Sequence, residues 1–261
     1  MSTPLPTFHN LRLSLSSTIL ILHLSNPPTN AFTTSLYTSL ISALDYATSR
    51  NNLTCLLITG SGNYFTSGVD FIDQSENYNE SIVKQFMLKF MNFPIPIIAC
   101  LNGPAIGIGA TLLYHCDYIF GSSTRNNGKR NYVLMPFTKW CLAPEFCSSV
   151  LLGRRMGVGT EMLLFGERVS IKKLADLGFL RTEPKYTPKT ILNHTKEYII
   201  NNLSSHVHSR ESAMLFVKLT RLKRNKDLRL EEVMNNEMKE IAKRVDRGEV
   251  REAVLKGFSK L

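Results

Sequence analysis

The stretch that most restricts how this chain can fold is residues 102–111, with the sequence NGPAIGIGAT. It follows the apolar run PIIACL and leads into a segment with helical character. A strand, a glycine-rich turn and a helix start, in that order, leave backbone N–H groups without partners at the turn. Such a turn admits a phosphate or a developing oxyanion, although most are plain connectors. It is not a dinucleotide-binding fingerprint, because Gly107-Ile108-Gly109 lacks a third glycine three residues further on.

A second stretch, residues 56–71, has the same organisation: an apolar strand, a glycine turn, and then S-G-V-D at positions 67–70. Together the two stretches resemble the crotonase (enoyl-CoA hydratase/isomerase) superfamily. In that family S/A-G-x-D follows one apolar strand and N-G-x-A-x-G follows a later one. The resemblance covers residue 26 to about residue 176 and continues more weakly through the C-terminal helices. It implies an α/β fold, a spiral of ββα units with a C-terminal helical trimerisation region.

The resemblance also implies how the two turns act. Two backbone N–H groups stabilise the charge that develops on a thioester oxygen, and loss of one such donor costs about 3–4 kcal/mol. By the resemblance these donors are the N–H groups of Val69 and Ile108. The residues implied to contact the acyl-CoA substrate all belong to the two turns: Ser67, Gly68, Val69, Asp70, Phe71, Gly107 and Ile108. We expect Asp70 to fix its loop rather than to act as a catalytic group.

Glu145 is the candidate base. Hydratases of the family carry two glutamates, at positions occupied here by Thr111 and Phe137, and neither of these side chains can transfer a proton from water. Residues 144–149 read PEFCSS, which resembles the P-E-x-C-S-S pattern around the base of peroxisomal Δ3,Δ2-enoyl-CoA isomerases. Apolar neighbours are expected to raise the pKa of Glu145, which suits proton shuttling. Without the resemblance, a lone glutamate in a loop would be interpreted as a solvated surface residue.

Two positions depart from the family pattern, which usually has glycine near Cys141 and often at Phe146. A bulky Phe146 is expected to narrow the pocket or to redirect the backbone. Alternatives to the isomerase therefore stay open: a dienoyl-CoA isomerase, an acyl-CoA thioesterase, or a non-catalytic homologue that binds acyl-CoA or RNA. The formal net charge of +10 motivates the RNA alternative. No aromatic residue interleaves the basic residues of segment 218–229, so nucleic-acid binding is not the favoured interpretation.

Several features bear on location and partners. The C-terminal tripeptide Ser259-Lys260-Leu261 is a peroxisomal address that an import receptor reads. Residues 1–10 carry no lysine or arginine, so a secretory signal is not expected, and no apolar run is long enough to span a membrane. The five cysteines show no CxxC spacing and predict buried thiols in a reducing compartment. No metal or redox cofactor is implied, since His206 and His208 lack further ligands and CoA arrives as part of the substrate.

The chain is expected to contain a core for acyl-CoA binding and catalysis, residues 1–186, and a helical region, residues 187–261, that assembles a homotrimer or hexamer. Hydrophobic periodicity predicts a hairpin over 11–24. The further predicted strands cover 53–59, 96–101, 117–121, 132–137 and 179–183, and the predicted helices cover 33–47, 82–93 and, with glycine interruptions, 148–164. The polar segment 73–81 is predicted to be a loop or a short helix that helps to wall the acyl tunnel.

Overall fold

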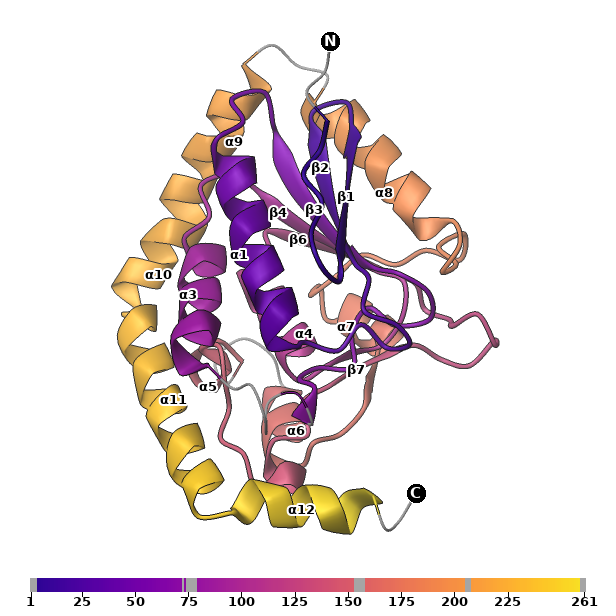
Figure 1. Cartoon of the computed structure of the whole chain (residues 1–261). Helices are drawn as coiled ribbons and strands as arrows, with labels where there is room; N and C mark the ends of the chain where they lie inside the picture. The colour runs from indigo at the N-terminus through magenta and orange to yellow at the C-terminus, as the bar shows by residue number, and fades with distance from the viewer. Residues whose placement is uncertain (1–3, 72, 74–78, 153–157, 205–207, 259–261) are drawn as a thin grey trace.

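A five-stranded sheet forms the centre of the computed structural model, which describes residues 4–71, 73, 79–152, 158–204 and 208–258 (Figure 1). The order is β1-β2-β3-β4-β6, antiparallel between the first two strands and parallel elsewhere. The strands are β1 (Leu11–Ser16), β2 (Ile19–Leu24), β3 (Cys55–Gly60), β4 (Ile97–Leu101) and β6 (Tyr118–Gly121). The predicted hairpin and the predicted strands near 53–59, 96–101 and 117–121 are confirmed.

Both faces of this sheet are buried, as is usual for parallel strands. Alternate residues of β3 point to opposite sides: Leu56 and Ile58 belong to the main apolar core, whereas Cys55 and Leu57 belong to a second cluster. Helices α1 (Thr34–Thr48) and α3 (Glu80–Met91) cover the first side, and α8 (Ile191–Ile199) covers the other (Figure 1). The continuous apolar runs of β2 and β4 follow from this two-sided burial.

The predicted helices begin where the sequence offers a cap. The Thr33 side chain accepts a hydrogen bond from the N–H of Leu36 at the start of α1, and Asn79 does the same for Ile82 at the start of α3. Helix α3 then buries one face, formed by Val83, Phe86, Met87, Phe90 and Met91. Most of the polar segment predicted at 73–81 lies outside the described residues.

A small second sheet was not predicted from the sequence. It consists of β5 (Ala105–Ile106), β7 (Tyr132–Leu134) and β8 (Val169–Ser170), in the order β5-β7-β8, so the strand predicted at 132–137 is shorter than expected. The prediction of a strand at 179–183 is wrong. Only Arg181 pairs there, through backbone bonds to Ile119 and Gly121, because the following residues turn away: the Tyr186 N–H bonds to the Glu183 carbonyl.

The C-terminal helices fold back along the core of their own chain. Helices α9 (Ser209–Val217), α10 (Lys223–Asp227) and α11 (Leu230–Asp246) run along one edge of the molecule, with α10 beside α3 (Figure 1). The π-helical turn η4 (Lys218–Leu222) joins α9 to α10, and α12 (Glu249–Phe258) crosses below α6 (Gly159–Leu164). The predicted helix at 148–164 is represented by α5 (Ser148–Leu151) and α6, with residues 153–157 outside the described part. The domain division at residue 186 and the trimerisation role stay predictions.

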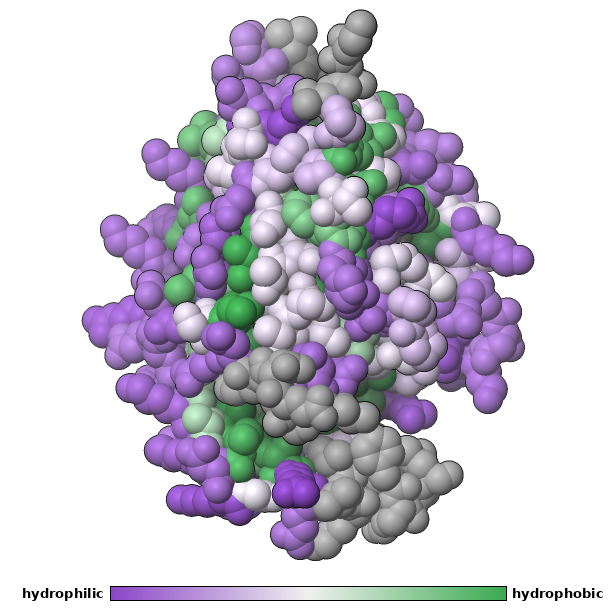
Figure 2. Space-filling model, in the orientation of Figure 1, coloured by the Kyte–Doolittle hydropathy of each residue, from purple (hydrophilic) through white to green (hydrophobic). Residues whose placement is uncertain are grey.

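Two buried polar residues attach these helices. Arg221 of η4 is 3% exposed and donates to the carbonyls of Phe93, Ile95 and His115, at 2.6, 3.0 and 3.1 Å. Asn225 of α10 donates to the carbonyl of Met91 at 2.8 Å. Hydrophilic side chains gather along the edge where α9–α11 lie (Figure 2). None of the described helices is long and apolar enough to cross a membrane.

Candidate active site

The first glycine turn is built by Asn30 and Thr66. The buried Asn30 amide donates to the carbonyls of Ser61 and Tyr64, at 2.8 and 2.9 Å. The Thr66 hydroxyl donates to the Asn30 carbonyl at 2.6 Å and accepts from the N–H of Gly68 at 3.0 Å. The turn is therefore fixed from within before it reaches Val69, and the N–H of Gly68 is already used.

Val69 lies opposite Phe32 in an isolated parallel bridge. The Phe32 N–H donates to the Gly68 carbonyl at 2.8 Å, and the Asp70 N–H donates to the Phe32 carbonyl at 3.0 Å. In an extended chain successive N–H groups point to opposite sides. The N–H of Val69 therefore points away from Phe32, and none of the hydrogen bonds found among the described residues uses it.

The second turn contains Gly107, with φ 56° and ψ −123°, a conformation that favours glycine. Its N–H donates to the Leu134 carbonyl of β7 at 3.0 Å, and its carbonyl accepts from Ala110 and Thr111. Helix α4 (Ile108–Thr111) starts at the next residue and continues into the 3₁₀ turn η1 (Leu112–His115). As the first residue of a helix, Ile108 has no intrahelical acceptor for its N–H.

The two turns are in direct contact. The Ile106 N–H donates to the Thr66 carbonyl at 3.1 Å. A Cβ atom placed on Gly68 would lie 2.9 Å from the Ile106 carbonyl oxygen, and one placed on Gly107 would lie 3.7 Å from the Gly68 Cα. Val69 and Ile108 each follow one of these touching glycines. The structure thus brings together the two turns that the sequence singled out.

The remaining residues of the first turn also make contacts with the protein itself. The Ser67 hydroxyl donates to Thr29 at 2.8 Å. A carboxylate oxygen of Asp70 accepts from the N–H of Asp73 at 3.1 Å, which agrees with the expectation that Asp70 fixes the loop. Phe71 stacks on Trp140 with ring centroids 5.2 Å apart, and this pair links the first turn to the segment that leads to Glu145.

The Glu145 loop contains three non-glycine residues with left-handed backbones: Cys141, Phe146 and Cys147, with φ 54°, 53° and 62°. The family pattern usually has glycine near Cys141 and often at Phe146, and glycine adopts such a backbone without strain. The Phe146 ring turns into the core, is 1% exposed and stacks on His115 at 4.2 Å. The Nε2–H of His115 donates to the Phe146 carbonyl at 2.9 Å. Phe146 therefore packs the loop onto η1 instead of filling a surface pocket.

Glu145 is partly buried, and loss of hydration, followed by the negative charge of Glu237, raises its pKa to about 8. Within the described chain no donor is hydrogen-bonded to its carboxyl group, so nothing there favours the ionised form. Thr111 and Phe137, at the two hydratase positions, are both buried, and the Thr111 hydroxyl is bonded to the Ile108 carbonyl. Glu145 is thus the carboxyl group of the predicted site with a pKa suited to proton transfer near neutral pH.

Sequence reasoning missed Glu237. It lies on α11, is 7% exposed, and its carboxylate accepts from the N–H of Cys147 at 2.6 Å, from the N–H of Ser149 at 3.0 Å, and from the Ser149 hydroxyl. A signal existed: Leu230, Met234, Glu237 and Met238 share the buried face of α11, where a carboxylate is out of place. Its partners could not be inferred, because they lie some 90 positions earlier in the chain.

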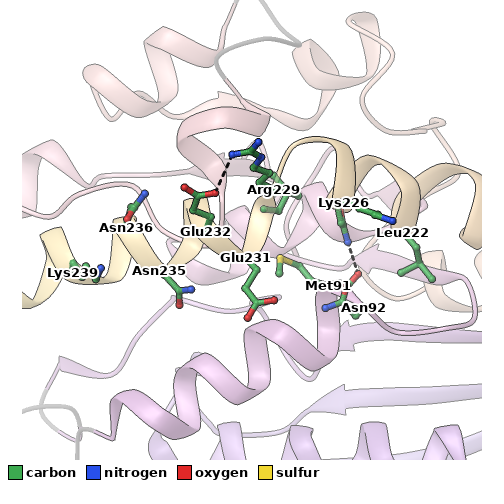
Figure 3. A pocket seen from close by; sticks show the side chains of 12 residues that line it. Met91, Asn92, Leu222, Lys226, Arg229, Glu231, Glu232, Asn235, Asn236 and Lys239 are labelled. Atoms are coloured by element: carbon green, nitrogen blue, oxygen red, sulfur yellow. Dashed lines mark hydrogen bonds and ion pairs between the residues drawn. The ribbon is translucent and has the colours of Figure 1, made fainter.

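A surface pocket of about 760 Å³ lies elsewhere, between the end of α3 and the α10–α11 turn (Figure 3). Its lining mixes cations such as Lys226 and Arg229 with the carboxylates of Glu231 and Glu232, and it includes no predicted site residue. His208 pairs with Glu211 in the described region, whereas His206 lies outside it. The searched part of the chain contains no group of ligands able to hold a metal ion.

Comparison with known proteins identifies the family to which the chain belongs. The sequence model of the enoyl-CoA hydratase/isomerase family matches residues 14–258. Rat enoyl-CoA delta isomerase 2 and mouse peroxisomal enoyl-CoA delta isomerase 3 are each 32% identical, over 55% and 57% of this chain. The matches span 38% and 49% of those longer relatives. The structure of an enoyl-CoA hydratase/isomerase from Pseudoalteromonas atlantica superposes with a TM-score of 0.85 at 26% identity, covering 97% of this chain and 98% of that one.

Proposed function

Because the chain belongs to the enoyl-CoA hydratase/isomerase family, we propose that it moves the double bond of a 3-enoyl-CoA to give trans-2-enoyl-CoA. The observation that carries this proposal is the environment of Glu145. It has a raised pKa and no hydrogen-bond donor within the described chain, and it lies on a loop that His115 and the Phe71–Trp140 pair attach to the two glycine turns. One such base is sufficient for an isomerisation that neither gains nor loses atoms.

In the proposed mechanism Glu145 in its ionised form removes a proton from C2 of the substrate. The electron pair moves onto the thioester oxygen, where the N–H groups of Val69 and Ile108 stabilise the negative charge. Protonated Glu145 then returns the proton to C4, and the double bond forms between C2 and C3. No metal or redox cofactor takes part in this proposal, since the proton leaves and returns through one carboxyl group.

Hydration of a 2-enoyl-CoA requires a group that activates water. The side chains at the two positions that supply it in family hydratases are those of Thr111 and Phe137, and neither is a carboxylate. We therefore expect the isomerase reaction to exceed hydration.

We also propose that the protein acts in peroxisomal β-oxidation of unsaturated fatty acids, as a homotrimer or hexamer. The C-terminal Ser-Lys-Leu and the name of the mouse relative support this location, although residues 259–261 lie outside the described part. Deleting residues 259–261 should leave a folded protein in the cytosol, as seen by fluorescence of an N-terminal fusion. Entry of the truncated protein into peroxisomes would require another signal or a partner.

The test of the activity compares 3-enoyl-CoA and 2-enoyl-CoA as substrates of the purified protein. Glu145→Gln should lower kcat by about 10²–10⁴-fold with little change in KM, because the binding groups remain. Glu167→Gln, at an exposed glutamate, is the matched control and should retain full turnover. Hydration as fast as isomerisation, release of free CoA, or full turnover by Glu145→Gln would overturn the assignment.

A further inference from the structure

We propose that Glu237 is the positioning residue of the base: its carboxylate holds the loop that carries Glu145 and places a lasting negative charge beside it. This inference deepens the proposed function and rests on the role of Glu145 as the base. It assigns a catalytic contribution to α11, a helix that supplies no residue of the predicted site.

Glu237 holds the loop through three hydrogen bonds. The two oxygens of Glu237 are divided between two peptides, Oε2 accepting from Cys147 at 2.6 Å and Oε1 from Ser149 at 3.0 Å. The Ser149 hydroxyl also donates to Oε1. These donors lie at the start of α5, whose N-cap residue Cys147 makes no capping bond with its own side chain, so Glu237 supplies the capping oxygens. The bonded peptides begin two residues after Glu145.

The loop needs such an anchor because its backbone is strained. Phe146 and Cys147 both have positive φ, which side-chain-bearing residues adopt only when their surroundings impose it. His115 bonds the carbonyl of Phe146 from one side, and Glu237 bonds the N–H of Cys147 from the other. The conformation that presents Glu145 is therefore determined by contacts from η1 and α11 together.

The two carboxyl groups have opposite environments. Glu237 accepts three hydrogen bonds, all of which favour its ionised form, whereas no donor reaches Glu145 within the described chain. Burial raises the pKa of both groups, but these bonds oppose the rise at Glu237. Glu237 consequently loses its proton first, and its charge then disfavours ionisation of Glu145. Two carboxyl groups whose environments separate their affinities for a proton are typical of an acid–base site.

Other charged groups around the pair do not replace Glu237. His115 is neutral at physiological pH, because burial lowers its pKa to about 3, and burial raises the pKa of the Cys147 thiol. Arg224 of α10 acts on both of these groups and bonds the Tyr114 carbonyl. Arg244 of α11 is ion-paired with Glu249. Among the described residues no lysine or arginine forms an ion pair with Glu237.

The first experiment uses three variants of the full-length protein and the pH profile of kcat/KM. Glu237→Gln removes the charge and presents an amide N–H to a peptide N–H, so we expect kcat to fall at least tenfold and the midpoint of the acid limb to move about one pH unit lower. Ser149→Ala removes one hydrogen bond and keeps the charge, so kcat should fall while the midpoint stays. Glu240→Gln on the exposed side of α11 should change neither.

An unchanged midpoint and an unchanged kcat in Glu237→Gln would overturn the proposal, and so would an equal midpoint shift in Glu240→Gln. A second measurement needs neither turnover nor a folded Glu237 variant. In wild-type protein labelled with ¹³C along the glutamate side chain, with each carboxyl signal assigned through the backbone of its own residue, the Glu145 signal should titrate near pH 8 and the Glu237 signal at lower pH. The reverse order would refute the inference. If the wild type titrates as expected but does not isomerise 3-enoyl-CoA, the proposed function alone fails.

Discussion

Replacing Phe146 by glycine and by alanine tests whether the Glu145 loop is strained as described. The ring is 1% exposed and packs against His115, Phe86 and Phe90, with centroids 4.2, 6.1 and 6.1 Å away. Its backbone has φ 53°, which glycine adopts freely and alanine does not. Both variants lose the same packing, apart from one methyl group, so their difference reports mainly on the backbone.

The magnitudes follow from these two terms. Loss of a buried phenylalanine side chain in favour of alanine costs about 3–5 kcal/mol in the free energy of unfolding. The left-handed conformation costs a residue with a Cβ atom about 1–2 kcal/mol, and glycine avoids this cost. Part of the gain is offset, because glycine has more conformational freedom than alanine in the unfolded chain. Phe146→Gly should therefore be about 1 kcal/mol more stable than Phe146→Ala. Both should be less stable than the wild type.

Phe90 provides the matched control. It belongs to the same aromatic cluster, is fully buried and lies within α3. At a helical position alanine is favoured over glycine by about 0.5–1 kcal/mol. The order of the two variants should therefore reverse between position 90 and position 146.

The assay is urea unfolding of the four variants at one protein concentration, because assembly would make the midpoint depend on concentration. If Phe146→Gly unfolds at a lower urea concentration than Phe146→Ala, the backbone at this position is not strained and the reasoning is refuted. The same order at both positions would lead to the same conclusion.

Three further perturbations test other parts of the structure. The raised pKa of Glu145 means that the folded protein binds this proton more tightly than the unfolded chain does. The contribution of Glu145 to stability is therefore present below about pH 4.5 and is lost as the pH rises through about 8. Between pH 5 and pH 9 the urea midpoint of Glu145→Gln should fall less than that of the wild type. Gly107→Ala should reduce both stability and turnover, because a backbone with φ 56° and ψ −123° suits only glycine. The control Gly128→Ala, at an open turn with φ 74°, should lower stability modestly and leave turnover unchanged. Arg221→Met should lower the free energy of unfolding by about 3–5 kcal/mol, because it leaves the Asp117 carboxylate buried without the guanidinium that lies 3.5 Å away. A variant as stable as the wild type would show that this ion pair is dispensable.

The sequence was informative where structure is determined locally. The hairpin at 11–24, the helix α1 and the two glycine turns all depend on neighbouring residues, and each was predicted close to its observed position. The contact between Gly68 and Gly107 was predictable only through the family resemblance, since it joins residues far apart in the chain.

The misses have non-local causes. Apolar residues at 179–183 suggested a strand, but pairing is decided by the partner edge and by the turn that Glu183 and Tyr186 form. Phe146 suggested either a narrowed pocket or a redirected backbone, and its actual direction depends on the space beside His115. Glu237 carried only the signal of a carboxylate on an apolar helix face.

The way in which α10 and α11 close over the core has a consequence for synthesis on the ribosome. The bond from Arg221 to Phe93 spans 128 positions, and the bond from Cys147 to Glu237 spans 90. A nascent chain that has emerged only to the end of α8 can complete the central sheet and both glycine turns, yet the loop around Glu145 still lacks its acceptor on α11. That loop reaches its final conformation only after α11 has left the ribosome, so chains interrupted before residue 237 would expose the apolar surface beneath α11 to chaperones and proteases.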